Sequence, residues 1–293
     1  MTKFKIVVKI VLSISLLLIC VSSNAQKYYQ PSIIQPSWER DYPPFRIAGN
    51  LYYVGTEDLA CYLITTPSGS ILINTGLASS APLIADHIKK LGFKLSDVKI
   101  LLTTQAHFDH VGGMAEIKKL TGAKMEVEAG DAGILADGGN SDFVFGGKGP
   151  LFAPVKADVL LHGDAVVKLG NMKINVLSHP GHTQGSCSFL FDVKDEQHTY
   201  KVLVANMPSV LDETKLSGMP TYPNVGKDYA YTFNAMKNIH FDLWLASHAG
   251  QFDMDKKHKP GDGYNPEAFR DQKGYDAALA NLYKAYLKKL NGK

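Results

Sequence analysis

A group of metal-binding side chains lies near the middle of the chain, in the segment Gln105-Ala106-His107-Phe108-Asp109-His110. Two imidazoles and one carboxylate fall within four residues there, and this donor set suits zinc. Histidine recurs in two later segments, His179-Pro180-Gly181-His182-Thr183 and Ser247-His248-Ala249-Gly250. The recurrence, more than the first group alone, indicates a metal site assembled from distant parts of the chain.

Each histidine segment follows an apolar run that we expect to form a strand, over residues 98–102, 173–177 and 243–245. Loops at strand ends are where a rigid scaffold presents catalytic groups. Further strands are expected at 51–54, 61–65, 71–73, 165–169, 188–192 and 202–205, and helices at 82–91, 114–120, 229–239 and from between 268 and 275 to 290. Each half of the chain has strands first and helices after, so we predict two sheets flanked by helices.

These segments resemble the metallo-β-lactamase fold superfamily, whose metal motif is His-x-His-x-Asp-His followed by a distant Gly-His-Thr and a late His. The wider pattern is similar to subclass B3 metallo-β-lactamases from about Ile47 to the last helix, and includes residues 58–64 and 71–77. The resemblance implies an α/β fold, the αββα four-layer sandwich, formed by residues 26–293. It also implies zinc-dependent hydrolysis of the β-lactam amide bond in penicillins, cephalosporins and carbapenems, which confers antibiotic resistance.

The resemblance also assigns the metal ligands, as two sites for one or two zinc ions. One site comprises Gln105, His107 and His182, and the other comprises Asp109, His110 and His248. Asp109 would in addition orient the attacking water. Gln105 replaces the first histidine of the family motif, a variant known within the subclass. Because a neutral amide oxygen is a weaker ligand than imidazole, we expect the Asp109/His110/His248 site to fill first.

A second departure from the subclass is Met207, where its members commonly carry serine. A thioether cannot replace a hydroxyl that positions water or a substrate carboxylate. We therefore expect Ser209, or a second water, to take over that contact. His179 is expected to support a ligand or to pack, and the remaining histidines to be structural or solvated.

Two segments are candidates for the border of the pocket. The stretch 130–150 carries five glycines between 138 and 149, and loops of that length commonly cover a site. The lead before the first strand holds Trp38, Tyr42 and Phe45. We expect Trp38, Tyr42 and Phe45 either to border the pocket or to pack in the core, and the sequence favours neither.

Residues 1–25 have the order of segments that is typical of a cleaved secretory signal. Lys3 and Lys5 precede an apolar run, and small residues follow at Ser23 and Ala25. A retained membrane anchor is the alternative, although the uncharged run is shorter than the roughly 20 residues that a span needs. We therefore expect a periplasmic protein with no membrane association after cleavage.

Two cysteines, Cys61 and Cys187, remain after cleavage of the signal. We expect them to be buried thiols rather than a disulfide.

The charge balance argues against a nucleic-acid partner. The whole chain has 31 basic and 28 acidic side chains, and without the three lysines of the signal the numbers are equal. Nothing indicates a coiled coil, so we expect a monomer that acts on a small molecule. Because fold alone does not choose a reaction, a lactonase, a thioesterase or a non-enzymatic periplasmic zinc-binding protein remain alternatives.

Overall fold

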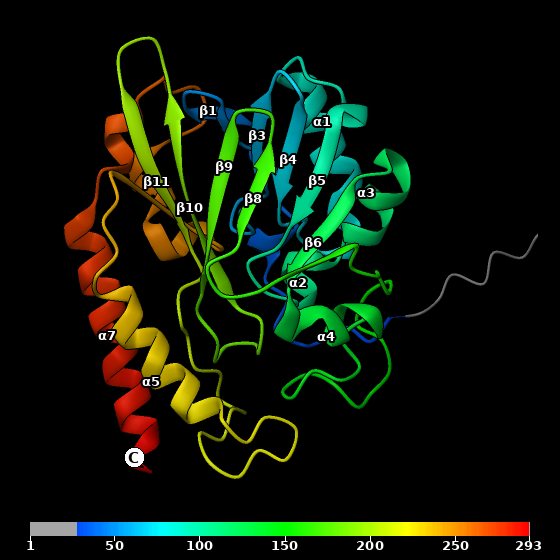
Figure 1. Ribbon diagram of the computed structural model, residues 1–293, viewed down its shortest axis with the longest axis vertical. Helices are drawn as coiled ribbons and strands as arrows, with labels where there is room; N and C mark the ends of the chain where they lie inside the picture. The colour runs from blue at the N-terminus through cyan, green and yellow to red at the C-terminus, as the bar shows by residue number, and fades with distance from the viewer. Residues whose placement is uncertain (1–27, 293) are drawn as a thin grey trace, which may run out of the picture.

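Two β-sheets lie face to face, with helices on both outer sides, in the computed structural model, which describes residues 28–292 (Figure 1). The first sheet has seven strands in the order β1 (Phe45–Ala48), β2 (Leu51–Tyr53), β3 (Tyr62–Thr66), β4 (Gly69–Ile73), β5 (Val98–Leu102), β6 (Lys124–Glu128) and β7 (Val159–Leu161). The second has five, in the order β12 (Leu243–Ala246), β11 (Thr199–Ala205), β10 (Cys187–Lys194), β9 (Met172–Ser178) and β8 (Val166–Leu169). The expected αββα sandwich is confirmed, while the expected secretory signal lies outside the described residues.

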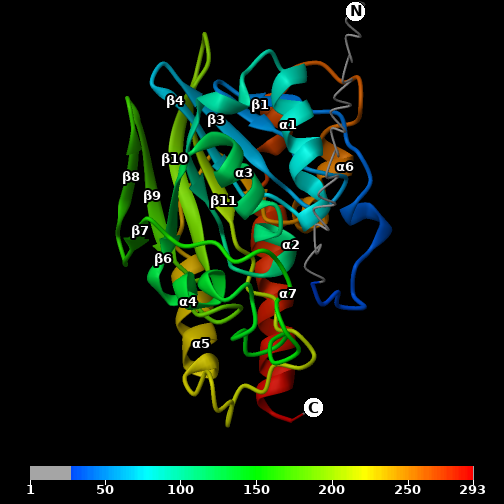
Figure 2. The same cartoon turned by 90° about the vertical axis from the view of Figure 1, so that its right-hand side faces the viewer.

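Helices α1 (Ala81–Lys90) and α3 (Met114–Thr121) lie on the outer side of the first sheet, between strands that they connect (Figures 1 and 2). Strands β4, β5, β6 and β7 run parallel, as helical crossovers require. Helices α5 (Val225–Met236) and α7 (Gln272–Leu290) pack beside each other next to the second sheet. The short helices are α2 (Phe108–Val111), α4 (Ala132–Ala136) and α6 (Met254–Lys257).

The alternation of side chains along β4 separates two apolar layers. Ile71 and Ile73 belong to the core shared by the two sheets, whereas Leu72 belongs to the core under α1 and α3. Successive residues of a strand point to opposite faces, so a strand buried on both faces is apolar throughout. The first sheet is therefore held on both sides, which gives a firm base to the loops at its strand ends.

The two cysteines lie in different layers and are both free and buried. Cys187 belongs to the layer between the sheets, and Cys61 to the layer under the helices. Burial raises the pKa of both thiols. The expectation of buried thiols is confirmed.

Several elements differ from the expectation. Helix α5 begins at Val225 rather than at residue 229, and α4 lies inside the stretch expected to be a loop. Strands β1, β6 and β7 were not expected. In β6, polar or charged residues alternate with buried Met125 and Val127, so the segment has no continuous apolar run that would indicate a strand.

No helix within residues 28–292 is long and apolar enough to cross a membrane.

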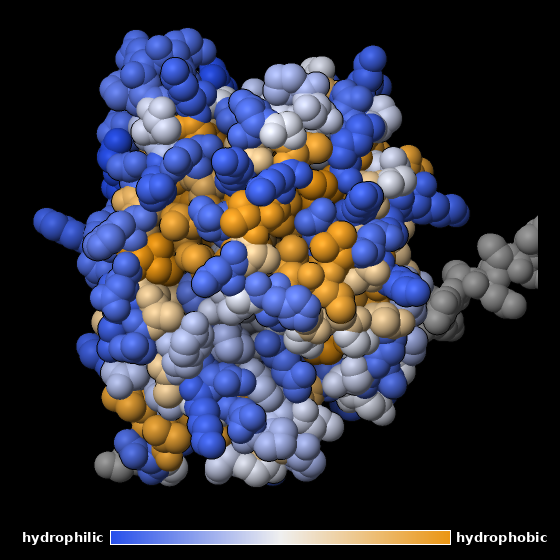
Figure 3. Space-filling model, viewed as in Figure 1, coloured by the Kyte–Doolittle hydropathy of each residue, from blue (hydrophilic) through white to orange (hydrophobic). Residues whose placement is uncertain are grey.

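The face shown in Figure 3 is hydrophilic at its edges, and apolar side chains gather near its middle. Exposed apolar residues include Val159 and Leu160 of β7 and Val166 of β8, where the chain passes from one sheet to the other.

Candidate metal centre

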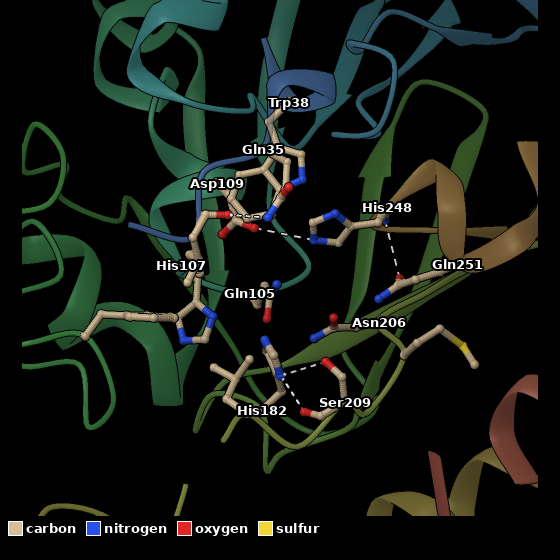
Figure 4. Close-up of a pocket in the computed structure, with 14 residues that line it drawn as sticks. Gln35, Trp38, Gln105, His107, Asp109, His182, Asn206, Ser209, His248 and Gln251 are labelled. Carbon is tan, nitrogen blue, oxygen red and sulfur yellow. Dashed lines mark hydrogen bonds and ion pairs between the residues drawn. The ribbon is translucent and has the colours of Figure 1, made fainter. Parts of the chain in front are cut away.

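A pocket of about 260 Å³ lies where several strands of both sheets end. The loop after β5 contributes Gln105 and His107, and α2 contributes Asp109. Segments after β9, β11 and β12 contribute the other polar walls. The sequence-predicted residues that line it are Gln105, His107, Asp109, His182, Ser209 and His248, and their side chains face a common space in Figure 4.

Asp109, His110 and His248 form one compact group. Oδ2 of Asp109 lies 3.4 Å from Nε2 of His110 and 3.4 Å from Nε2 of His248. One ligand atom from each of the three residues lies within 4.8 Å of the others. Nε2 of His110 is buried and has no hydrogen-bond partner. An unpartnered buried nitrogen beside a carboxylate and a second imidazole fits a metal ion.

The ring of His248 is held by contacts on its far side. Its Nδ1 donates to Oδ2 of Asp58 at 3.0 Å, and Nε1 of Trp38 donates to the same oxygen at 3.0 Å. The backbone N–H of Gly250 donates to Oδ1 of Asp58 at 2.9 Å. Because a carboxylate only accepts, Nδ1 keeps its proton, and Nε2 is the ring nitrogen that faces Asp109 and is placed to bind a metal.

Gln105, His107 and His182 form a second group on the other side of the pocket. The rings of His107 and His182 lie with centroids 4.8 Å apart. Nδ1 of His182 donates to the carbonyl oxygen of Ser209 at 2.7 Å, which leaves its Nε2 without that proton. Oε1 of Gln105 is buried and accepts no hydrogen bond. An amide oxygen left without a donor fits a weak ligand to a cation.

The electrostatics of the first group favour one anion and one cation. Burial alone raises the pKa of Asp109, but His110 and His248 outweigh it, and the net pKa lies below its usual range. Burial lowers the pKa of His110 to about 3. Burial also lowers the pKa of His248, but Asp109 and Asp58 together raise it to about 9. At neutral pH the carboxylate is thus charged and His248 holds a proton that a metal ion would displace.

Asp131 joins the two loops that carry the second group. Its Oδ2 accepts the backbone N–H of Ala106 and the hydroxyl of Thr183, both at 2.7 Å, and its Oδ1 accepts the N–H of Gly185 at 2.7 Å. A Cβ on Gly185 would lie 2.4 Å from the backbone nitrogen of Asp131, so only glycine fits there. Asp131 could not be recognised from the sequence, because a buried carboxylate that joins two distant loops leaves no local pattern.

The expectations for the remaining residues have mixed outcomes. Ser209 lines the pocket. Its carbonyl and its hydroxyl both contact Nδ1 of His182, so Ser209 also orients the ring of His182. His179 does not line the pocket, and its Nδ1 is hydrogen-bonded to Oγ of Ser188 at 2.7 Å. Trp38 lines the pocket, whereas Tyr42 packs in the core between the sheets. Phe45 packs against that core, and Met207 lies in the pocket wall.

Comparisons with known proteins identify the family of this chain. Residues 55–195 match the model of the metallo-β-lactamase superfamily. A solved β-lactamase from Chitinophaga pinensis is 62% identical, with a TM-score of 0.87, over 88% of this chain and 97% of that one. A solved class B3 di-zinc metallo-β-lactamase from an Alaskan soil metagenome is 60% identical, with a TM-score of 0.87, over 89% of this chain and 99% of that one.

A curated hydroxyacylglutathione hydrolase from Rhodopseudomonas palustris is more distant, at 33% identity over 131 residues. The alignment spans 45% of this chain and 42% of that hydrolase, so the chain matches less than half of its length. The likeness to the solved β-lactamases, in contrast, extends over nearly their whole length. The chain therefore belongs to the metallo-β-lactamase superfamily and, within it, to the class B3 metallo-β-lactamases.

Proposed function

We propose that the protein is a zinc-dependent β-lactamase that hydrolyses the amide bond of penicillins, cephalosporins and carbapenems. The observation that carries the proposal is the group of Asp109, His110 and His248, whose ligand atoms lie within 4.8 Å of one another beside a pocket that Asp109 and His248 line. These residues would hold the first zinc ion. A zinc ion bound there supplies a water with a pKa near 7 and polarises the substrate carbonyl.

Asp109 is the residue of this group best suited to act on water. Its carboxylate stays ionised at neutral pH, because the two neighbouring imidazoles outweigh the effect of burial. A charged carboxylate is a strong hydrogen-bond acceptor and can orient a water molecule toward the substrate. We therefore assign Asp109 two roles, as a metal ligand and as the group that orients water.

Two amides with fixed orientations face the substrate space. Oε1 of Gln251 accepts the backbone N–H of His248 at 3.4 Å, which turns its Nε2 toward the pocket (Figure 4). Nδ2 of Asn206 donates to the carbonyl of Thr104 at 3.1 Å, so its Oδ1 is the free end. No lysine or arginine lines this pocket in the described chain. A substrate carboxylate would thus meet one neutral donor, Nε2 of Gln251, in place of the hydroxyl that Met207 lacks, whereas Oδ1 of Asn206 offers an acceptor to a donor group of the substrate.

The second group would bind zinc more weakly. His107 and His182 are oriented for a metal, and Gln105 contributes only an amide oxygen. We expect one firmly held zinc and a second that is lost on dialysis against a mild chelator. Two firmly held zinc ions per chain would contradict this expectation.

The proposed setting is the periplasm of a bacterium, reached through cleavage of residues 1–25 as a secretory signal. There the enzyme would meet β-lactams before they reach their targets and so confer resistance. We further propose a monomer. The mass of the exported protein, measured by mass spectrometry, tests the cleavage after Ala25.

A substrate panel tests the function. Purified residues 26–293 with zinc are assayed against a penicillin, a cephalosporin, a carbapenem, a thioester and a lactone, beside Asp109→Ala. Hydrolysis of the β-lactams that is lost in the variant supports the proposal. Turnover of the thioester or lactone alone would make the protein another hydrolase of this fold. Zinc binding without any turnover would make it a zinc-binding protein.

A further inference from the structure

The glycine-rich loop between α4 and β7 reaches the metal centre through one buried carboxylate. Oδ2 of Asp142 lies 3.1 Å from Nε2 of His107, and the side chain of Asp142 is 1% exposed. Asp142 does not line the pocket itself. It therefore has no direct contact with a substrate there, and acts on the site only through His107 and through the loop.

The other oxygen of Asp142 shapes the loop. Oδ1 accepts the backbone N–H groups of Val144 at 2.8 Å and Phe145 at 2.6 Å. The resulting turn places the ring of Phe145 in the pocket wall, with its centroid 5.1 Å from that of His107. The turn is tight, because a Cβ on Gly146 would lie 2.3 Å from the carbonyl oxygen of Asp142.

We propose that Asp142 is a positioning residue that couples metal binding by His107 to the position of the loop wall at Phe145. The inference rests on the proposed function only in taking Gln105, His107 and His182 as a metal site. Because a carboxylate only accepts hydrogen bonds, the proton of His107 stays on Nε2 and the lone pair on Nδ1 is free for the metal.

The coupling acts in both directions. An oriented His107 binds a metal ion more readily, and a bound metal ion holds His107 and hence the carboxylate of Asp142 in place. The carboxylate in turn holds the amides of Val144 and Phe145. Metal at this site should therefore reduce the opening of the loop, which amide hydrogen exchange measures.

Two substitutions at Asp142 separate its two contacts. In Asp142→Asn the amide oxygen can still accept the N–H groups of Val144 and Phe145, but the NH₂ group then faces Nε2 of His107. This arrangement moves the ring proton to Nδ1, where it blocks metal binding. Asp142→Ala removes both contacts. The control is Asn140→Ser, since Asn140 accepts the N–H of Gly149 at 3.0 Å and has no contact with His107.

The experiment combines zinc titration against a chromophoric chelator with hydrogen exchange of residues 140–147 followed by mass spectrometry. For the whole protein, zinc at saturation should slow exchange in this segment. Both Asp142 variants should bind the weaker of two zinc ions roughly 10- to 100-fold less tightly and leave the tighter zinc unchanged. Exchange at Val144 and Phe145 should be fast and independent of zinc in Asp142→Ala, and slower in Asp142→Asn.

Asn140→Ser should exchange faster while it keeps wild-type affinity for both zinc ions. The inference is overturned by wild-type affinity for the weaker zinc in both Asp142 variants, by exchange that zinc does not change in the unaltered protein, or by the absence of a second zinc at saturation. Neither readout involves β-lactam turnover. A protein that shows these effects but hydrolyses no β-lactam would contradict the proposed function and leave this inference standing.

Discussion

Nδ1 of His248 lies 3.0 Å from Oδ2 of Asp58, and the indole N–H of Trp38 donates to the same oxygen at 3.0 Å. Three segments far apart in the sequence thus meet behind one proposed metal ligand. Partners of this kind fix the orientation of a ligating imidazole and commonly contribute 10- to 100-fold in metal affinity.

Asp58→Asn should weaken the tighter zinc site by roughly 10- to 100-fold, because an amide can present a donor to Nδ1 of His248 and favour the wrong tautomer. Trp38→Phe should have a smaller effect, since it removes one donor to Asp58 and keeps an aromatic ring. Zinc titration against a chelator measures both. The matched control is Glu57→Gln, at a neighbouring carboxylate that pairs with Arg40 on the surface. Equal affinities in Asp58→Asn and the control would argue against this role of Asp58.

Gln105→His should convert the weaker site into a firmly occupied one, because imidazole is a stronger ligand for zinc than an amide oxygen. The expected metal content after dialysis against a mild chelator is two zinc ions per chain for the variant and one for the unaltered protein. Gln35→His is the control, since Gln35 lines the same pocket but its Nε2 donates to the carbonyl of Ile33. A variant that still retains only one zinc would contradict the assignment of Gln105.

Asp131→Asn should destabilise the folded protein by about 1–3 kcal/mol. Three donors converge on the carboxylate of Asp131, and an amide must turn its NH₂ group toward at least one of them. One buried donor is then left unsatisfied. Urea unfolding of the metal-free protein measures the change, with the exposed residue Asp164 replaced by Asn as the control. Equal unfolding midpoints for Asp131→Asn and the control would show that the hydrogen bonds of Asp131 do not stabilise the folded protein.

His179 should make the protein sensitive to acid. Burial lowers the pKa of His179 to about 4, so the folded state disfavours protonation of the ring. In the unfolded chain a histidine has a pKa near 6.5. The neutral, buried ring of His179 therefore costs the folded state nothing above pH 6.5. As the pH falls toward 4, the free energy of unfolding decreases, by about 2–3 kcal/mol at pH 4.5.

The variant His179→Asn, whose amide can donate to or accept from the hydroxyl of Ser188, removes the titrating group. Its free energy of unfolding in chelator should fall less between pH 7 and pH 4.5 than that of the unaltered protein. If both proteins lose the same stability over this range, His179 is not a source of the acid sensitivity.

Much of the site could be predicted from the sequence, because His107, Asp109 and His110 follow a buried strand and their residue types imply their chemistry. The order of apolar strand-like runs and helices in each half of the chain likewise predicts two sheets flanked by helices. The residues that hold the site in place could not be predicted. Asp131 binds backbone N–H groups 25 and 54 positions away, and Asp142 contacts the ring of His107, 35 positions away, through contacts that only the folded chain creates.

Ser209 shows a different limit of the sequence. It was expected to contact substrate through its hydroxyl, yet the strongest contact in the structure is from Nδ1 of His182 to its backbone carbonyl at 2.7 Å. Any residue type offers that carbonyl, so no pattern of side chains could have revealed it. The start of α5 was also placed too late, because Gly226 lies in its first turn and lowers the helical signal.

The decisive measurement is the rate of carbapenem hydrolysis by metal-free protein as zinc is added. There should be no turnover without metal, activity should rise with the first equivalent of zinc, and Asp109→Ala should lose more than about 100-fold at saturating zinc. Hydrolysis that persists in excess chelator, or full activity in Asp109→Ala, would contradict the proposed function.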